Sequence, residues 1–214
     1  MNTSSLRLAL SIVGARAAVR ASALAGRGGT SLPGLVALRL DPWLVRHVAV
    51  QLGDGAIVVA GTNGKTTTSA LLASALRAGG RRVLHNRAGS NMLRGIATTL
   101  AGCTRVNGTL RGAADLTGLF EVDEAALPDV LAQVAPRVVV LTNLFRDQLD
   151  RYGELQTIAD RWRSAIQLLP RHTVLVLNAD DPLVASLGTS APGPLLYFGV
   201  ERWIGSDPVA APAA

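Results

Sequence analysis

The sequence has little of several residue types, and each shortage excludes a class of protein. It contains one cysteine, Cys103, so no disulfide can form within the chain, as is typical of proteins from a reducing cytoplasm. Aromatic residues make up only 4% of the sequence, too few for base-stacking surfaces, so nucleic acid is not an expected partner. No apolar run approaches the roughly 18 residues of a membrane-spanning helix. These shortages favour a globular cytoplasmic protein.

Lysine is the scarcest charged residue. Lys65 is the only lysine among 21 basic residues, and it lies in the stretch VVAGTNGKTTT at residues 58–68. A compact ammonium group on a flexible stem can enter a narrow cradle of backbone N–H groups and bridge two phosphates. A planar guanidinium group is too wide for such a cradle. Lys65 is therefore predicted to be a functional residue.

The residues around Lys65 have the order of a phosphate-binding loop. Residues 56–60 predict an apolar strand and residues 66–78 a helix, so the loop at residues 61–66 leads from a strand into a helix. At such a junction backbone N–H groups and the helix dipole hold an anion, lysine reaches the phosphates, and the next hydroxyl binds magnesium. The loop is shorter than the general P-loop pattern, because Val59 stands where that pattern has glycine.

Short apolar segments alternate with helical segments along most of the chain. Apolar strands without polar alternation, separated by helices, predict a doubly wound α/β fold with a mostly parallel sheet. Its ligands should bind beyond the carboxyl ends of the strands. Strands are expected at residues 56–60, 83–85, 116–122, 138–141, 173–177 and 195–198, helices at 41–52, 66–78, 91–100, 124–134 and 153–169, and a loop at 26–34.

The net charge of +6 is unevenly distributed along the chain. The first 40 residues contain five arginines and no acidic residue. Such a segment attracts a phosphorylated substrate, an anionic membrane surface or, least favoured here, nucleic acid. Residues 6–24 predict an amphipathic helix with Arg16 and Arg20 on its polar side. A cleaved leader is the alternative, since the segment also contains arginine and serine and has no acidic residue.

Five stretches together resemble one family. They are, in order, GTNGKTTT (61–68), NRAGSNMLRG (86–95), EVDEA (121–125), TNLFRDQLDRYGE (142–154) and NADDP (178–182). The set resembles the Mur ligases and folylpolyglutamate synthases, which form amide bonds through an acyl phosphate. Over about residues 28–198 it is most similar to the Mur ligase-like subunits of lipid II isoglutaminyl synthases. Such subunits activate the D-glutamate α-carboxylate of lipid II for amidation by glutamine-derived ammonia, a step of peptidoglycan biosynthesis.

This resemblance implies a domain organisation and leaves alternatives. It implies a basic helical N-terminal segment (1–52), a Mur ligase-like ATP-binding domain (53–204) and a Pro/Ala tail (205–214). The alternative within the superfamily is a ligase of the folylpolyglutamate synthase type. Outside it, the alternatives are a P-loop kinase or NTPase and a non-catalytic remnant that only engages partners.

The resemblance also assigns roles to individual residues. It implies catalytic roles for Lys65 and Glu121, and magnesium binding by Thr66 and Glu121. The alternative for Glu121 is an acid at a helix N-terminus, a role that Asp123 and Glu124 fit better, and the alternative for residues 178–182 is a turn that opens a helix. The nucleotide-binding set is Gly61, Thr62, Asn63, Gly64, Lys65, Thr66, Thr67, Asn178 and Asp181, and the substrate-binding set is Arg87, Arg94, Asn143 and Asp147.

The sequence departs from the family pattern at several points. Gln148 stands where most Mur ligases have a histidine that binds a second magnesium ion, and an amide oxygen is a weaker ligand. The related subunits continue into a four-cysteine zinc ribbon and a domain that docks a GatD-like glutaminase. With one cysteine and an end at Ala214, this sequence predicts no zinc site and little amidation without a partner. The protein is expected in the cytoplasm, and at the inner face of the bacterial membrane if the basic N-terminal segment meets anionic headgroups.

Overall fold

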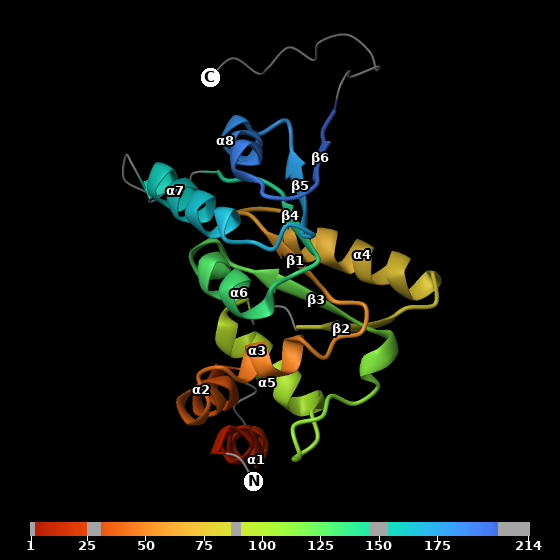
Figure 1. Ribbon diagram of the computed structural model, residues 1–214, viewed down its shortest axis with the longest axis vertical. Helices are drawn as coiled ribbons and strands as arrows, with labels where there is room; N and C mark the ends of the chain where they lie inside the picture. The colour runs from red at the N-terminus through yellow and green to blue at the C-terminus, as the bar shows by residue number, and fades with distance from the viewer. Residues whose placement is uncertain (1–2, 25–30, 87–90, 146–153, 201–214) are drawn as a thin grey trace.

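One parallel sheet organises the chain (Figure 1). The computed structural model describes residues 3–24, 31–86, 91–145 and 154–200. Within them six strands pair in the order β2-β3-β1-β4-β5-β6, and every pairing is parallel. The strands are β1 (Ala56–Ala60), β2 (Arg82–His85), β3 (Leu116–Val122), β4 (Val138–Leu141), β5 (Val174–Asn178) and β6 (Leu195–Phe198). The predicted α/β class and parallel sheet are confirmed.

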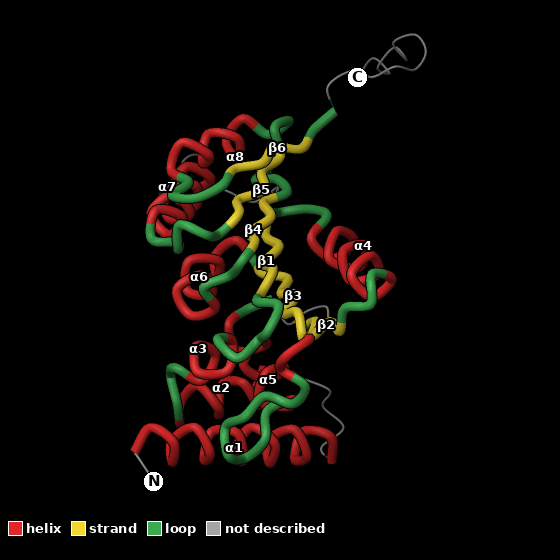
Figure 2. The backbone as a smooth tube through the Cα atoms, turned by 45° about the vertical axis from the view of Figure 1, so that its right-hand side comes forward, coloured by secondary structure: helices red, strands yellow, loops and turns green. Residues whose placement is uncertain are grey.

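Helices cover the sheet unequally. The α-helices are α1 (Thr3–Leu24), α2 (Ser31–Leu40), α3 (Leu44–Ala49), α4 (Lys65–Ala78), α5 (Leu93–Cys103), α6 (Leu127–Val134), α7 (Glu154–Gln167) and α8 (Pro182–Ser186). The described residues also form three short 3-10 helices, η1 (Ala113–Asp115), η2 (Glu124–Ala126) and η3 (Leu187–Ser190). Of the described helices, α4 covers one face of the sheet, and α6, α7 and α8 lie on the opposite side (Figure 2).

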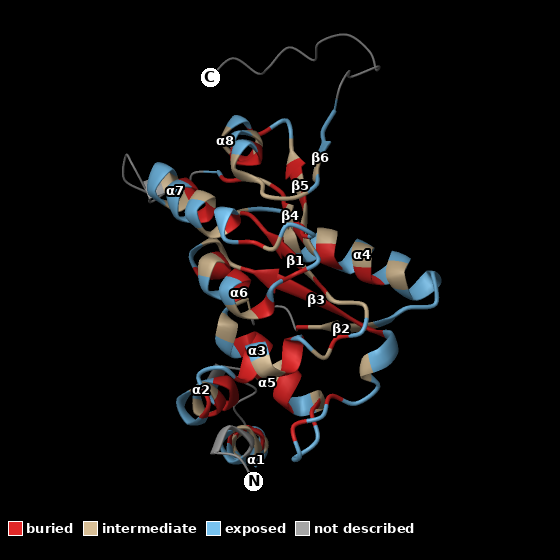
Figure 3. Cartoon of the chain, viewed as in Figure 1, coloured by how far each residue is buried: buried red, intermediate tan, exposed pale blue. Residues whose placement is uncertain are grey.

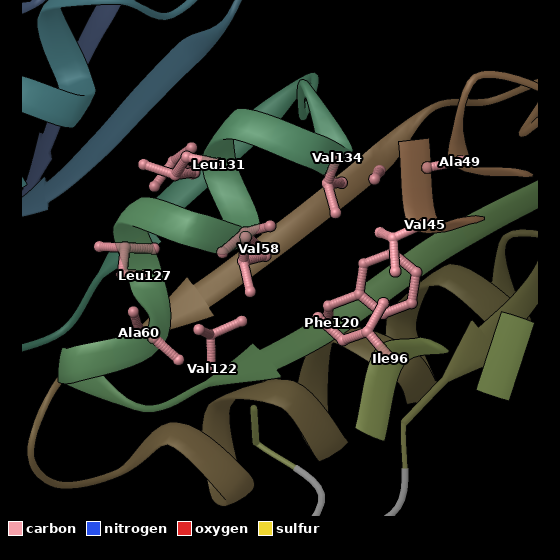
Figure 4. Packing of buried hydrophobic residues seen from close by; sticks show 14 of the residues in the cluster. Val45, Ala49, Val58, Ala60, Ile96, Phe120, Val122, Leu127, Leu131 and Val134 are labelled. Atoms are coloured by element: carbon pink, nitrogen blue, oxygen red, sulfur yellow. The ribbon is translucent and has the colours of Figure 1, made fainter. Parts of the chain in front are cut away.

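The two faces of the sheet bury cores of different size. On the α4 side Val59 and Leu119 pack with Ala73 in a small cluster. On the other side Val58 and Phe120 belong to the main core, with side chains from α3, α5 and α6 (Figure 4). Alternate residues of a strand point to opposite faces, so β1 and β3 each serve both clusters and are buried along nearly all of their length (Figure 3).

The N-terminal helices belong to the main core. Ile12 of α1, Ala37 of α2 and Val45 of α3 are buried in the same cluster as Phe120 of β3. The core therefore continues across residue 52, the predicted domain boundary, without a break.

Helix α2 corrects one prediction. Residues 26–34 were expected to form a loop, but residues 31–34 begin α2. Pro33 lies in the first turn of the helix. N–H groups in this turn have no intrahelical acceptor, so proline, which lacks an N–H group, costs the helix no hydrogen bond there. Gly34 lets α2 approach α5 closely, because a Cβ atom there would lie 1.7 Å from the carbonyl oxygen of Arg94. A glycine that suggested a helix break instead serves a tertiary contact.

Helix α1 corrects a second prediction. It is helical as expected, but it is not amphipathic, because Ile12 is buried while Leu10 and Val13 are exposed on another side. The polar side expected to carry Arg16 and Arg20 is not formed either. The guanidinium group of Arg16 is half-buried and donates a hydrogen bond to the Thr104 carbonyl, whereas Arg20 is exposed. None of the described helices is long and apolar enough to cross a membrane.

Candidate functional site

The loop between β1 and α4 requires glycine at two positions. Gly61 has φ +144°, and a Cβ atom there would lie 2.1 Å from Thr142 Oγ1 and 2.8 Å from the Asn143 carbonyl oxygen. Gly64 has φ +79° and is the N-cap of α4. Both dihedral angles lie in the left-handed region that side chains with a Cβ atom rarely adopt. Glycine at position 61 therefore lets the loop pass close to the residues that follow β4, and glycine at position 64 lets the chain turn into α4.

The segment that follows β4 holds this loop in shape. The Thr62 N–H donates to the Asn143 carbonyl at 2.9 Å, and the Asn63 N–H donates to Asn143 Oδ1 at 2.8 Å. Asn143 Nδ2 donates in return to the Asn63 carbonyl at 3.0 Å. The described contacts thus make Asn143 a support of the phosphate loop. Its predicted contact with substrate stays a prediction.

Lys65 begins α4 and folds back over the loop. Its Nζ atom donates to the carbonyl oxygens of Gly61 at 2.6 Å and Thr62 at 2.9 Å. It also lies 3.9 Å from Asp123 Oδ1 and 3.8 Å from Glu124 Oε2, with 12% of its side chain exposed. Sequence reasoning did not assign these two carboxylates to the lysine. An ammonium group has three rotatable donors and can contact both carbonyls and an incoming anion from one point.

Thr66 and Glu121 meet at the carboxyl end of β3. Thr66 Oγ1 donates to Glu121 Oε1 at 2.8 Å, and Glu121 is almost fully buried. Asn91 Nδ2 contacts both Glu121 Oε1 at 3.2 Å and Asp123 Oδ1 at 3.3 Å. The structure therefore brings together the two residues predicted to bind magnesium. Glu121 lies within β3, and its carboxylate accepts hydrogen bonds from the side chains of Thr66 and Asn91. The alternative role for Glu121 would instead have the carboxylate at the first turn of a helix.

The donor set around Glu121 suits magnesium. This ion commonly keeps several waters and takes one or two protein oxygens together with phosphate oxygens. Thr66 Oγ1 and Glu121 Oε1 are such oxygens, and Asn91 Oδ1 is buried without a hydrogen-bond partner among the described residues. Across the described ranges no group of three or more histidine, cysteine or acidic side chains is placed to hold a metal ion alone. The residues therefore fit a metal that arrives with phosphate.

Asn86 supports the main chain of Glu121. Its Oδ1 accepts from the Glu121 N–H and its Nδ2 donates to the Glu121 carbonyl, both at 2.8 Å. Sequence reasoning missed this role and that of Asn91. The available signal for Asn86 was its place directly after a strand, at the edge where an α/β sheet binds its ligands.

His85 ends β2 on the α4 side of the sheet. It pairs in register with Leu119, whose side chain packs toward α4. Burial lowers the pKa of His85, the nearby charge of Glu121 opposes that shift, and Arg77 adds to it. Its Nε2 atom is buried without a hydrogen-bond partner among the described residues. Burial thus favours the neutral form of this imidazole.

Asn178 and Asp181, predicted to bind the nucleotide, lie at the last residue of β5 and in the turn that follows it. Asn178 Oδ1 accepts from the Asp180 N–H at 3.0 Å. Asp181 Oδ1 caps α8 by accepting from the N–H groups of Leu183 and Val184, and Oδ2 accepts from the Leu144 N–H at 2.7 Å. The carboxylate of Asp181 is buried and engaged by three donors, as the helix-opening alternative requires. Nucleotide contact by either residue stays a prediction.

The remaining predicted residues are placed as follows. Thr67 is exposed in the first turn of α4, beside the loop. Arg94 is exposed in the first turn of α5 and contacts Met92 Sδ at 3.1 Å. Arg87, Asp147 and Gln148 lie outside the described residues.

A glycine loop, one lysine and a threonine–glutamate pair at the carboxyl edge of a parallel sheet are the arrangement typical of proteins of the P-loop class. The chain belongs to the Mur ligase family, because residues 59–202 match the model of the Mur ligase middle domain.

Within that family the chain is similar to MurT, described as a subunit of lipid II isoglutaminyl synthase (glutamine-hydrolyzing). It is 36% identical over 187 residues to MurT of Staphylococcus aureus strain COL, covering 87% of this chain and 40% of that protein. It is 40% identical over 180 residues to MurT of Streptococcus pneumoniae strain R6, covering 82% and 37%. The chain thus spans about 40% of the length of these relatives.

The fold agrees with this assignment. A crystal structure of MurF from Acinetobacter baumannii superimposes with a TM-score of 0.62 at 22% identity, over 79% of this chain and 35% of that one. At this identity the likeness concerns the fold.

Proposed function

We propose that the chain is the ATP-binding domain of a lipid II isoglutaminyl synthase subunit of the MurT type. The observation that carries this proposal is the joint placement of the Gly61–Gly64 loop, Lys65 and the Thr66–Glu121 pair at one sheet edge. The MurT resemblance supports the choice of lipid II as the substrate. The reaction is ATP-dependent formation of a carbon–nitrogen bond.

The residues of the loop would act on the phosphates of ATP. N–H groups at the start of α4 bind phosphate oxygens, and Lys65 moves from the carbonyls of Gly61 and Thr62 onto them. Thr66 and Glu121 would hold magnesium, which neutralises phosphate charge when bound. In the proposed reaction an oxygen of the D-glutamate α-carboxylate attacks the γ-phosphorus and ADP leaves. Ammonia then attacks the acyl carbon and phosphate leaves, which gives the amide.

The proposal includes a partner and a location. The relatives are named as glutamine-hydrolyzing, so a GatD-like glutaminase would supply the ammonia. The enzyme would work in the cytoplasm at the inner face of the membrane, where a lipid-linked substrate is exposed. The sequence predicts no zinc for this segment of the protein.

Calorimetry of ATP·Mg binding tests the site, comparing the native chain with Lys65→Arg, which keeps the charge. The wide guanidinium group cannot occupy the position of Lys65 between two carbonyls, so we expect affinity to fall at least about tenfold, or 1.4 kcal/mol. Arg77→Lys, the reverse exchange at an exposed position of the same helix, should bind as the native chain does. Equal affinity of Lys65→Arg and the native chain would contradict the proposed cradle.

Phosphate release separates the candidate functions. A ligase of the proposed kind releases phosphate only when a lipid II acceptor and an ammonium salt are both present, since the salt replaces the glutaminase. Release without an acceptor would favour an NTPase, and release with a folate acceptor would favour a folylpolyglutamate synthase. Failure of the native chain to bind ATP·Mg would favour a non-catalytic remnant.

A further inference from the structure

We infer that the outward side of α1 is a docking surface for an anionic lipid bilayer. This inference deepens the proposed function, whose substrate is lipid-linked, but it rests on the side chains of α1 and its neighbours. The surface consists of Leu6, Leu10, Val13 and Ala17, which we call the α1 ridge.

The α1 ridge is a continuous apolar row. Its members are spaced i, i+4, i+7 and i+11, which places them on one side of a helix with 3.6 residues per turn. Leu6, Leu10 and Val13 are 49%, 52% and 48% exposed, and Ala17 is also exposed. A row of this kind is the apolar side that an interfacial helix inserts between lipid headgroups.

The opposite side of α1 is occupied by the protein itself. Ile12 and Ala15 are fully buried, and Gly14 touches α2, because a Cβ atom there would lie 2.8 Å from Leu40 Cδ1. Leu8 packs against the core and lies against Gly108. Since α1 is held by this inner side, the ridge cannot turn inward without breaking the core.

The charged side chains of α1 and of the segments that pack beside it are arginines. Helix α1, helix α2 and residues 91–114, which include α5 and the turn beside α1, contain no acidic residue. Arg7 and Arg20 are exposed on α1 itself, and Arg105 is exposed next to Thr104, the residue that accepts from Arg16. Arginines that flank an apolar row attract a surface of anionic headgroups.

The position of α1 suits a flat surface. The helix lies across one end of the molecule, as Figures 1 and 2 both show, and its 22 residues form an edge about 33 Å long. The described chain ends at the other extreme of the molecule (Figure 1). A second copy of the chain is a poorer occupant, because two such faces would bring like charges together.

Sedimentation with vesicles tests this surface, using phosphatidylcholine vesicles with and without phosphatidylglycerol and no nucleotide. We expect the native chain to bind the anionic vesicles, and less so as salt is raised. The triple variant Leu6→Gln, Leu10→Gln, Val13→Gln should lose at least about tenfold in binding, because its apolar row is removed. The double variant Arg7→Gln, Arg20→Gln should bind more weakly and depend less on salt.

A matched variant controls for loss of exposed apolar residues in general. Leu71→Gln, Leu168→Gln, Leu196→Gln changes three exposed leucines on α4, after α7 and on β6, and should bind as the native chain does. Circular dichroism should give all variants the native melting profile.

Three results of the vesicle assay would overturn the inference. They are equal binding by the ridge variant and the native chain, equal loss in the matched control, and binding that ignores vesicle charge. A native dimer that becomes monomeric in the ridge variant would assign the surface to a second copy instead. Lys65→Arg should bind vesicles as the native chain does. A failed vesicle assay would therefore not affect the proposed ATP site, and a failed ATP-binding assay would not affect the α1 ridge.

Discussion

The phosphate loop and α1 use their side chains in opposite ways. Around the loop, polar groups that follow separate strands contact one another, as when Asn143 pairs with Asn63 and Thr66 with Glu121. On α1, apolar side chains point both into the core and out to solvent, as Ile12 and Leu10 do. The polar groups of the first region are partnered by other described residues, whereas the second region presents a surface that the described residues do not cover. Predictions for each region follow from this difference.

The largest effect is expected at the loop, from Gly61→Ala. The methyl group would lie 2.1 Å from Thr142 Oγ1 on a backbone with φ +144°. Backbone strain and overpacking together should lower the free energy of unfolding by roughly 2 to 6 kcal/mol. Urea denaturation measures the change.

Gly102→Ala is the matched control for Gly61→Ala. Gly102 lies in α5, and a Cβ atom there would meet nothing within 4 Å. This exchange should leave stability unchanged or raise it by about 0.4 to 1 kcal/mol. A similar stability for the two variants would mean that the loop backbone is not held as described.

A second prediction separates the two sides of α1. Ile12→Ala removes a fully buried side chain and should cost about 2 to 5 kcal/mol, whereas Leu10→Ala, half exposed, should change stability by no more than about 0.5 kcal/mol. Thermal melting of the two variants measures the difference. A large loss in Leu10→Ala would show that the outward side is packed, and would remove the contrast with the loop.

The smallest effect is expected at His85. Burial lowers its folded pKa below the ordinary 6.5, so the unfolded chain takes up the proton first as pH falls. Stability from the neutral imidazole is therefore present above the unfolded pKa and is lost as pH falls through the folded pKa. His85→Gln should flatten the decline of Tm on acidification.

His172→Gln, an exposed exchange before β5, is the control for removal of an imidazole as such. If His85→Gln left the dependence of Tm on pH unchanged, His85 would not be held neutral by burial.

The sequence predicted the features that are encoded locally. Apolar runs gave the strands, and the order glycine, lysine, threonine after a strand gave the loop, because both signals occupy a few adjacent residues. Features that depend on distant contacts were missed or misread. Gly34 suggested a helix break because its partner, the carbonyl of Arg94, is 60 residues away in sequence. Arg16 was expected on a polar side, but its partner Thr104 holds it against the protein.

The contact of Asn86 with Glu121 gives the sheet an unusual last rung. An asparagine side chain carries the same amide group as a peptide bond, and here this one amide pairs with both the N–H and the carbonyl of Glu121. Strand β2 ends at His85, and the side chain of Asn86 continues the hydrogen bonding to β3 one residue further. The main chain of Glu121 therefore keeps its hydrogen bonds on the β2 side at a position where β2 itself has ended.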